Sequence, residues 1–291
     1  MKRGFWACAT LFVTASAHAQ IQVDIKFQRL QYIAYEPVIA TVGITNLAGR
    51  DVELSNSDEQ AWFGLEVSGS EGQPISPTRD RLVQPPLRIE AGKRVTQKID
   101  LTPHFAIHDL GTYHVRAYIH FADLNRFFYS PRKVFEVTDA RPMWQRTVGI
   151  PTDASAAGNT RTYSLLTNRF PNYTGLYVRV EDKDTGIVYA TESLGHILSM
   201  YEPEAQLDRE NQLHVLHCAG PRSWTYSRVD LNGHVLVHTS FYETKSRPRL
   251  FHSAEGEVVV KGGMEAEAAK PATANPAPKL SDRPRVMPPK P

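Results

Sequence analysis

Short runs of alternating apolar and polar residues dominate this sequence from about residue 21 onwards. Residues 21–27, 38–44 and 63–67 are three of these runs, and Gly, Pro, Asn or Asp stands between them. Neighbouring side chains of a β-strand point to opposite faces, so this alternation indicates strands with one buried face. Apolar spacing typical of helices is almost absent. The pattern therefore predicts an all-β protein of short strands joined by turns.

The composition is that of a folded chain. The 291 residues are 41% hydrophobic and 22% charged, which is enough apolar material for a core and too little charge for a disordered chain. The length suggests two domains. The formal net charge of +2 is too small to indicate a nucleic-acid partner. After the first twenty residues no apolar run approaches the roughly 18 residues of a membrane-spanning helix.

Residues 1–19 have the three parts of a secretory signal peptide. Lys2 and Arg3 form a charged start, residues 4–16 are mostly apolar, and Ala17-His18-Ala19 is a small-residue cleavage site. An uncleaved anchor helix is the alternative, but the apolar segment is short for one. We expect export to the periplasm or the medium, with no transmembrane segment after cleavage.

Cysteine usage excludes an intrachain disulfide in the exported chain. Cys8 lies within the expected signal peptide, which leaves Cys218 as a single cysteine. We interpret Cys218 as a small buried hydrophobic residue rather than a catalytic nucleophile.

A motif within residues 20–139 specifies the first domain further. Residues 109–117 read Asp-Leu-Gly-Thr-Tyr-His-Val-Arg-Ala. This run resembles the D-x-G-x-Y-x-V-x-A motif of immunoglobulin-like domains, specifically the modules of secreted bacterial proteins, because no cysteine occupies the disulfide position. The resemblance implies a β-sandwich with a tyrosine corner, in which the Tyr113 hydroxyl bonds back to the backbone, Asp109 bonds within the turn and Gly111 permits a close approach. It implies no particular function.

Residues 140–162 contain Pro142, Pro151 and a run of small residues, and we interpret them as a linker anchored by Met143 and Trp144. Residues 163–263 then contain an internal repeat, because Tyr-Val-Arg-Val-Glu at 177–181 is echoed by Tyr-Ser-Arg-Val-Asp at 226–230. A period of about 45 residues resembles that of β-propeller blades. The expected strands are 176–182, 186–193, 204–208 and 212–218 in the first unit, and 224–230, 234–242, 248–253 and 257–262 in the second.

Two blade-like units are too few to close a propeller. They form either a second β-domain of two four-stranded units or a partial propeller completed by other chains. We favour the first arrangement, with the outer faces covered by the first domain and the protein a monomer. Residues 264–291 are rich in Pro, Ala and Lys and predict a disordered tail. It serves as a solvated spacer or as a weak contact with acidic polymers or lipid headgroups of the envelope.

Four residues of the second domain are candidate metal ligands. His214 and Cys218 share one face of a predicted strand, and His234 and His238 share a face of another. Neighbouring strands would bring these nitrogen and sulfur ligands together. No local metal motif accompanies them, so hydrogen-bonded or half-exposed histidines are the simpler interpretation. We expect no metal and no cofactor.

Aromatic residues suggest a binding surface instead. Phe127, Phe128 and Tyr129 form a dense group in the first domain. Packing in the core is the alternative to binding. The candidates for a platform that binds sugars or peptides in the second domain are Tyr173, Trp224, Tyr226, Phe241 and Tyr242.

The sequence contains neither a G-x-S-x-G nucleophile elbow nor a phosphate-binding P-loop. We therefore expect an exported, non-catalytic binding or scaffold protein of the bacterial cell envelope, with a protein or a glycan as its partner. One alternative is an envelope carbohydrate-active enzyme or its accessory module, and such an enzyme needs two carboxylates across a cleft. Another is a protease-inhibitor-like sandwich that uses the Pro- and Gly-containing loop 69–86.

Overall fold

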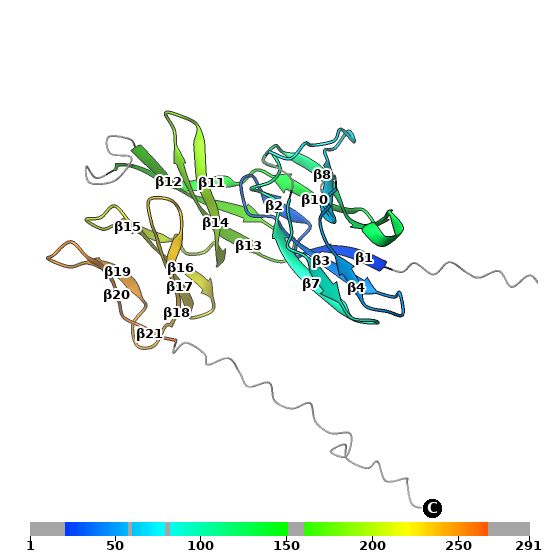
Figure 1. Cartoon of the computed structure of the whole chain (residues 1–291). Coiled ribbons are helices and arrows are strands. Elements are labelled where there is room, and N and C mark those ends of the chain that lie inside the picture. Colours follow the sequence, from blue (N-terminus) through cyan, green and yellow to red (C-terminus); the bar gives the residue numbers. More distant parts are fainter. Residues whose placement is uncertain (1–20, 58–59, 79–81, 151–159, 267–291) are drawn as a thin grey trace, which may run out of the picture. The chain divides into compact units, whose positions relative to one another are not determined.

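The computed structural model describes residues 21–57, 60–78, 82–150 and 160–266 (Figure 1). Strands make up the regular structure of these residues, apart from one 3-10 turn at Ala122–Leu124. The prediction of an all-β protein is confirmed. No helix in the described ranges is long and apolar enough to cross a membrane.

The described chain divides into two compact units. Of the described residues, the first unit contains those up to Gly149 together with 160–193, and the second contains Ile150 and those from Leu194 onwards. The expected signal peptide, residues 151–159 of the expected linker and the tail from residue 267 lie outside the described residues.

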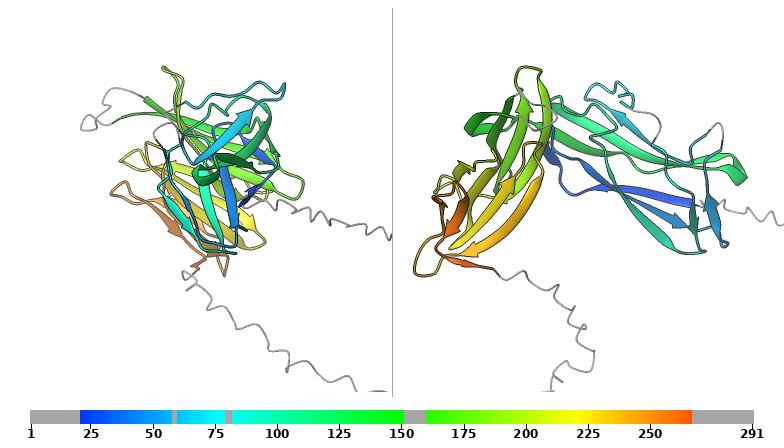
Figure 2. Two further views of the ribbon diagram at one scale, coloured as in Figure 1. Left: turned by 45° about the vertical axis from the view of Figure 1, so that its right-hand side comes forward. Right: turned by 60° about the vertical axis from the view of Figure 1, so that its left-hand side comes forward.

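Two sheets make up the first part of the chain, and the right-hand view of Figure 2 shows them as two layers. Neighbouring strands are antiparallel, except that β2 and β10 run parallel. The three-stranded sheet has the order β1 (Ile21–Phe27), β3 (Ile39–Asn46), β7 (Arg94–Asp100). The five-stranded sheet has the order β2 (Gln31–Ile33), β10 (Lys133–Thr138), β8 (Gly111–Phe121), β5 (Phe63–Ser68), and β9 (Arg126–Tyr129) also pairs with β8. A small ladder joins β4 (Val52–Leu54) and β6 (Leu87–Ile89).

The apolar positions of the alternating runs form the core between these sheets. Val23 and Ile25 of β1 are buried in one cluster with Val115 and Ile119 of β8, and Trp62 before β5 is fully buried beside them. Burying side chains of this size on both inner faces stabilises the sandwich, at about 25 cal/mol per Å² of apolar surface. The core therefore orients the alternate, polar positions of the same strands towards the outer faces.

Tyr113 joins the start of β8 to the turn before it. Its hydroxyl donates a 2.8 Å hydrogen bond to the backbone carbonyl of Asp109, which is the bond that a tyrosine corner contains. Its ring is buried and stacks on Phe135 with 5.4 Å between the centroids. Burial raises the pKa of Tyr113. Gly111 has φ of +144°, and a Cβ there would lie 2.8 Å from the Ser70 hydroxyl, so glycine suits this turn.

Replacing Tyr113 with Phe keeps the ring and removes the hydroxyl. We expect a loss of about 1 to 3 kcal/mol in the free energy of unfolding, because the Asp109 carbonyl loses its partner in a partly buried place. Urea denaturation measures this loss, and Tyr242→Phe, at a residue that is 49% exposed, is the control. An unchanged midpoint at unchanged slope would argue against a stabilising role for the bond.

The remaining strands form two further sheets and a hairpin. The four-stranded sheet has the order β11 (Arg141–Gly149), β12 (Thr160–Arg169), β13 (Thr174–Asp182), β14 (Ile187–His196). The other sheet has the order β15 (Glu204–Leu207), β16 (Leu213–Gly220), β17 (Ser223–Val229), β18 (Val235–Tyr242), β21 (Met264–Glu265). Strands β19 (Arg249–His252) and β20 (Val258–Lys261) form the hairpin.

The linker prediction for residues 140–162 is wrong where the structure describes them, because β11 and the first residues of β12 occupy this stretch. Pro142 is compatible with the strand for two reasons. It lies on β11, the edge strand of its sheet, and the register shifts between Pro142 and Trp144. Edge strands and bulges are the places where a sheet tolerates proline.

The eight strands predicted between residues 176 and 262 are all present close to their predicted bounds. Their grouping into units is wrong. Strands β13 and β14 pair within the sheet that contains β11 and β12, whereas β15 and β16 belong to the sheet of β17 and β18. A sequence repeat gives a period but no starting point, and the two strands that precede β13, namely β11 and β12, shift the start of the unit. Met264 and Glu265, predicted to belong to the tail, form β21.

Candidate functional site

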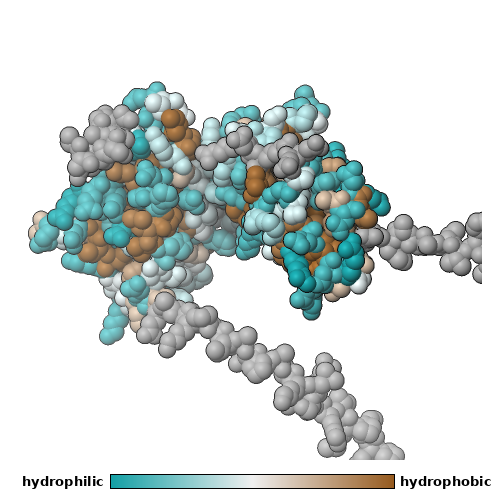
Figure 3. Space-filling model, in the orientation of Figure 1, coloured by the Kyte–Doolittle hydropathy of each residue, from teal (hydrophilic) through white to brown (hydrophobic). Residues whose placement is uncertain are grey.

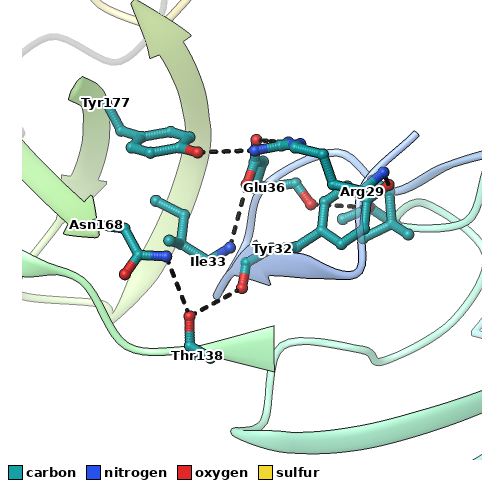
Figure 4. A network of polar contacts seen from close by, with 9 residues as sticks. Arg29, Tyr32, Ile33, Glu36, Thr138, Asn168 and Tyr177 are labelled. Atoms are coloured by element: carbon teal, nitrogen blue, oxygen red, sulfur yellow. Dashed lines mark hydrogen bonds and ion pairs between the residues drawn. The ribbon is translucent and has the colours of Figure 1, made fainter. Parts of the chain in front are cut away.

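A buried polar network joins the residues on either side of β2 to strand β13 (Figure 4). Arg29 lies between β1 and β2, and its guanidinium forms an ion pair with the carboxylate of Glu36, which is 4% exposed. The same guanidinium donates a 2.8 Å hydrogen bond to the Tyr177 hydroxyl on β13. The second oxygen of Glu36 accepts a 3.1 Å hydrogen bond from the backbone N–H of Ile33. Each charged group of the network is thus paired.

Further contacts complete this junction. The guanidinium of Arg29 lies 4.7 Å from the centre of the Tyr32 ring, and Arg179 of β13 donates a 2.6 Å bond to the carbonyl of Ala34. Beneath the polar groups an apolar cluster contains Ile33, Ala140, Leu166, Phe170 and Tyr177. The charged groups of the network satisfy one another, so we interpret it as a structural joint rather than a ligand site.

Burial raises the pKa of Glu36, against the opposing effects of Arg29 and the Ile33 N–H. Removing Arg29 would therefore leave a buried carboxylate without its counter-ion. We expect Arg29→Gln to lower the free energy of unfolding by about 3 kcal/mol, near the lower end of the range for buried pairs because Arg29 stays partly exposed. Urea denaturation at pH 7 measures the loss.

The matched control is the double variant Arg29→Gln/Glu36→Gln, which should lose less than the sum of the two single variants. The loss of unfolding free energy caused by Arg29→Gln should also become smaller as the pH falls towards 4.5. The double variant, which has no carboxyl at position 36, is the reference for this change. A carboxyl whose pKa is raised in the fold contributes stability at low pH and loses it as the pH rises. Additive losses that do not change with pH would contradict this account of the joint.

The outer face of strands β5, β8 and β9 carries aromatic and charged side chains. Because Val115, Ala117 and Ile119 of β8 point into the core, the residues between them point outwards. Arg116 of β8 lies opposite Glu66 of β5 in the register, and Tyr118 lies opposite Gly64. On its other side, Tyr118 pairs with Tyr129 of β9.

Three rings gather on this face. The Tyr118 ring centre lies 5.8 Å from that of Phe127 and 6.0 Å from that of Tyr129. Phe127 is 42% exposed and Tyr129 is 45% exposed, whereas Phe128 between them packs against the core. Gly64 makes room for the cluster, because a Cβ there would lie 2.2 Å from the Tyr118 ring. The result is an accessible aromatic surface on a rigid sheet.

An ion pair continues the aromatic surface. Nε of Arg116 donates a 2.6 Å hydrogen bond to Oε2 of Glu66. The guanidinium carbon of Arg116 lies 4.4 Å from the centre of the Tyr129 ring, in the geometry of a cation–π contact. Arg116 is thus held in place from two directions, with hydrogen-bonding capacity left over.

A cavity of about 470 Å³ opens beside this pair, within the size range of small-molecule sites. It lies at the edge of β5, between outward-facing residues of the sheet and the segment of residues 72–77, and Leu65, Val67 and Phe105 of the core also line it. Ile75 of this segment donates a 2.9 Å backbone bond to Val67 of β5, which fixes the wall. The lining includes Glu66, Pro74, Ile75, His114, Arg116 and Arg132. A second cavity of about 200 Å³, lined in part by Gly64 and Tyr118, shares Leu65 and Pro77 with it. We call the rings, the ion pair and the larger cavity the outer-face site.

The aromatic platform predicted in the second domain does not form. Trp224 is 1% exposed and lies in an apolar cluster with Leu250 and Val258 of the β19–β20 hairpin. Tyr226 lies on the same face of β17 as Trp224, because alternate residues of a strand face the same way. Tyr226 and Phe241 both pack against this cluster. Tyr173 stacks on Phe170 in the first compact unit. Of the five candidates, Tyr242 is exposed.

The four metal-ligand candidates also lie apart. Strand β17 separates β16 from β18 in the sheet, so the two predicted strands are not neighbours. His214 bonds to Asp208 at 3.0 Å and to Tyr226 at 2.8 Å, and burial lowers its pKa. His234 bonds to Asp230, His238 to Ser227, and the buried Cys218 to the Gly220 carbonyl. Within the described residues no group of three or more His, Cys, Asp or Glu side chains could hold a metal ion.

The second compact unit exposes apolar side chains as well, and Figure 3 shows hydrophobic surface over its strands. Leu236, Phe251 and Met264 are among the exposed residues. The 220 Å³ cavity of this unit has a different character, because its lining includes Asp208, His214, Arg228 and Glu257. We regard the outer-face site as the better candidate, since it combines exposed rings, charges and a cavity.

The sequence analysis found the aromatic group at residues 127–129 but missed Glu66, Arg116, Tyr118 and Arg132. A signal for two of them was present. Once Tyr113, Val115 and Ala117 are assigned to the core, Arg116 and Tyr118 must point outwards. Glu66 and Arg132 carried no comparable signal, because only strand pairing brings them to this face.

The comparisons with known proteins assign no family. No family model and no curated protein matches the chain. Among solved structures, the sporulation control protein Spo0M from Bacillus subtilis is similar to it, with a TM-score of 0.29 and 11% sequence identity. The similarity covers 69% of this chain and 91% of that chain. Similarity of this degree identifies neither the fold nor an activity.

Proposed function

We propose that this chain is an exported, non-catalytic binding protein of the bacterial cell envelope, and that its outer-face site binds a glycan. The observation that carries the proposal is the exposed pair Phe127 and Tyr129 beside the Arg116–Glu66 ion pair at a cavity. Sugar rings present C–H groups on their faces and hydroxyls around their edges. Aromatic rings pack against the C–H groups, and a guanidinium–carboxylate pair forms hydrogen bonds with the hydroxyls.

Export is supported by the pattern of residues 1–19, which has the charged start, apolar segment and cleavage site of a signal peptide. An immunoglobulin-like module over residues 20–139 is supported by the two facing sheets and by the hydrogen bond from Tyr113 to Asp109. The first two strands of the chain also lie in different sheets of the sandwich. Strand β1 pairs with β3 in the three-stranded sheet, and β2 pairs with β10 in the five-stranded sheet. On this proposal the protein acts as a monomer.

Two observations favour binding over the alternative functions. Glycoside hydrolysis needs two carboxylates across a cleft. Among the described residues that line the cavity, Glu66 is the single acidic one, and Arg116 holds it. A protease-inhibiting loop would have to project from the sandwich, whereas Ile75 within the 69–86 segment bonds back to β5. An accessory, glycan-binding role beside an envelope enzyme remains compatible with this site.

The double variant Phe127→Ala/Tyr129→Ala tests the proposal. We expect binding to purified peptidoglycan, or to soluble polysaccharides in a panel, to weaken about tenfold, because each ring contact contributes about 0.5 to 1.5 kcal/mol. Co-sedimentation and calorimetry with the full exported chain measure this. Tyr242→Ala, which removes an exposed ring elsewhere, should bind as the wild type does. Undiminished glycan binding by the double variant, or binding of envelope proteins alone, would contradict the proposal.

A further inference from the structure

Two basic side chains on the cavity wall have no partner among the residues that the structure describes. His114 of β8 and Arg132, just before β10, both line the 470 Å³ cavity. Within the described residues, neither side chain takes part in a hydrogen bond or an ion pair. A guanidinium has five N–H donors in a planar fork, and no residue in the described ranges uses those of Arg132. Donors on residues that line a cavity, and that no described residue uses, are available to a ligand.

The charges around the cavity do not balance. Arg116 and Glu66 neutralise each other through their 2.6 Å contact, which leaves the charge of Arg132 in excess. The imidazole of His114 adds a further hydrogen-bonding group to the same lining. A carboxylate matches the planar donor fork of an arginine, which it can bind through two parallel hydrogen bonds. The cavity is therefore complementary to a ligand that carries a carboxylate.

The position of the rings decides which kind of acidic ligand fits. Arg116 contacts the Tyr129 ring at 4.4 Å and also lines the cavity, so the aromatic surface and the basic wall meet at one residue. A polymer of ring-shaped units would place one unit in the cavity and the next on the rings. An extended acidic peptide would use the charges but would need no aromatic surface beside them.

We propose that the outer-face site selects acidic glycans. A sugar carboxylate sits in the cavity against Arg132 and His114, and the neighbouring sugar packs on Tyr129 and Phe127. This inference rests on the proposed glycan-binding function and goes beyond it, because it names the charge of the ligand and the residues that read it.

A matched pair of probes tests this selection. Oligogalacturonate carries a carboxylate on each sugar, and its methyl ester has the same backbone without the charge. We expect the full chain to bind the acid about tenfold more tightly than the ester in calorimetric titrations at low salt, because hydrogen bonds to charged groups are the strong ones. Added salt should reduce the difference.

The variants separate the two parts of the site. Arg132→Gln should lose the preference for the acid while binding the ester as before, and Phe127→Ala/Tyr129→Ala should weaken both probes. Arg169→Gln removes an exposed arginine from β12 and serves as the charge control, with no effect expected. Retention of the wild-type thermal midpoint shows that each variant is folded.

The outcomes distinguish the inference from the proposed function. Equal binding of acid and ester would overturn the acidic selection and leave glycan binding intact. Binding of neither probe, nor of any glycan in the panel, would overturn both. Tight binding of a poly-glutamate peptide that depends on Arg132 but not on the rings would overturn the glycan and favour an acidic protein partner.

Discussion

The ion pair between Arg29 and Glu36 is the interaction on which the arrangement of the first compact unit depends. Arg29 stands where the chain passes from β1 to β2, and thus from one sheet of the sandwich to the other. By also bonding Tyr177, it ties this crossing to the sheet of β11–β14. A buried carboxylate is costly without a counter-ion, so the three groups must stay together. The hydrogen bond to Tyr177 thus adds to the contacts between the β1–β2 crossing and β13 within the first compact unit.

The outer-face site depends on the same sandwich. The core fixes which side of β8 points inwards, and this leaves Arg116 and Tyr118 on the other side. Gly64 then admits the Tyr118 ring, and the wall at residues 72–77 closes one side of the cavity. A site built from a rigid sheet presents rings and charges at fixed spacing, which limits the entropy lost on binding. The functional proposal and its acidic selectivity both rest on this preorganisation.

Much of the fold was predictable because strands and turns are encoded locally. Alternation at residues 21–27 and at 257–262, with glycine or asparagine between runs, identified most of the longer strands close to their bounds, but not the short strands β2, β4 and β6 or the strands β11 and β12. The hydrogen bond of Tyr113 was anticipated from the resemblance of residues 109–117 to the tyrosine-corner motif, and its acceptor lies four residues away. The errors arose where local signals mislead. Pro142 suggested a linker, but the strand that contains it lies at a sheet edge, where proline is tolerated. Trp224 suggested an exposed platform, but the hairpin of Leu250 and Val258 covers it.

The sequence by itself determined the all-β class, the positions of most longer strands and the direction in which their side chains point, because period and turn chemistry are properties of neighbouring residues. Only the tertiary structure decided which strands share a sheet and which side chains meet. Glu66 and Arg116 are fifty residues apart, Arg29 and Tyr177 are 148 apart, and His214 and His238 are kept apart by β17. Such pairings depend on the burial and hydrogen bonding of the whole chain at once, and no local pattern specifies them.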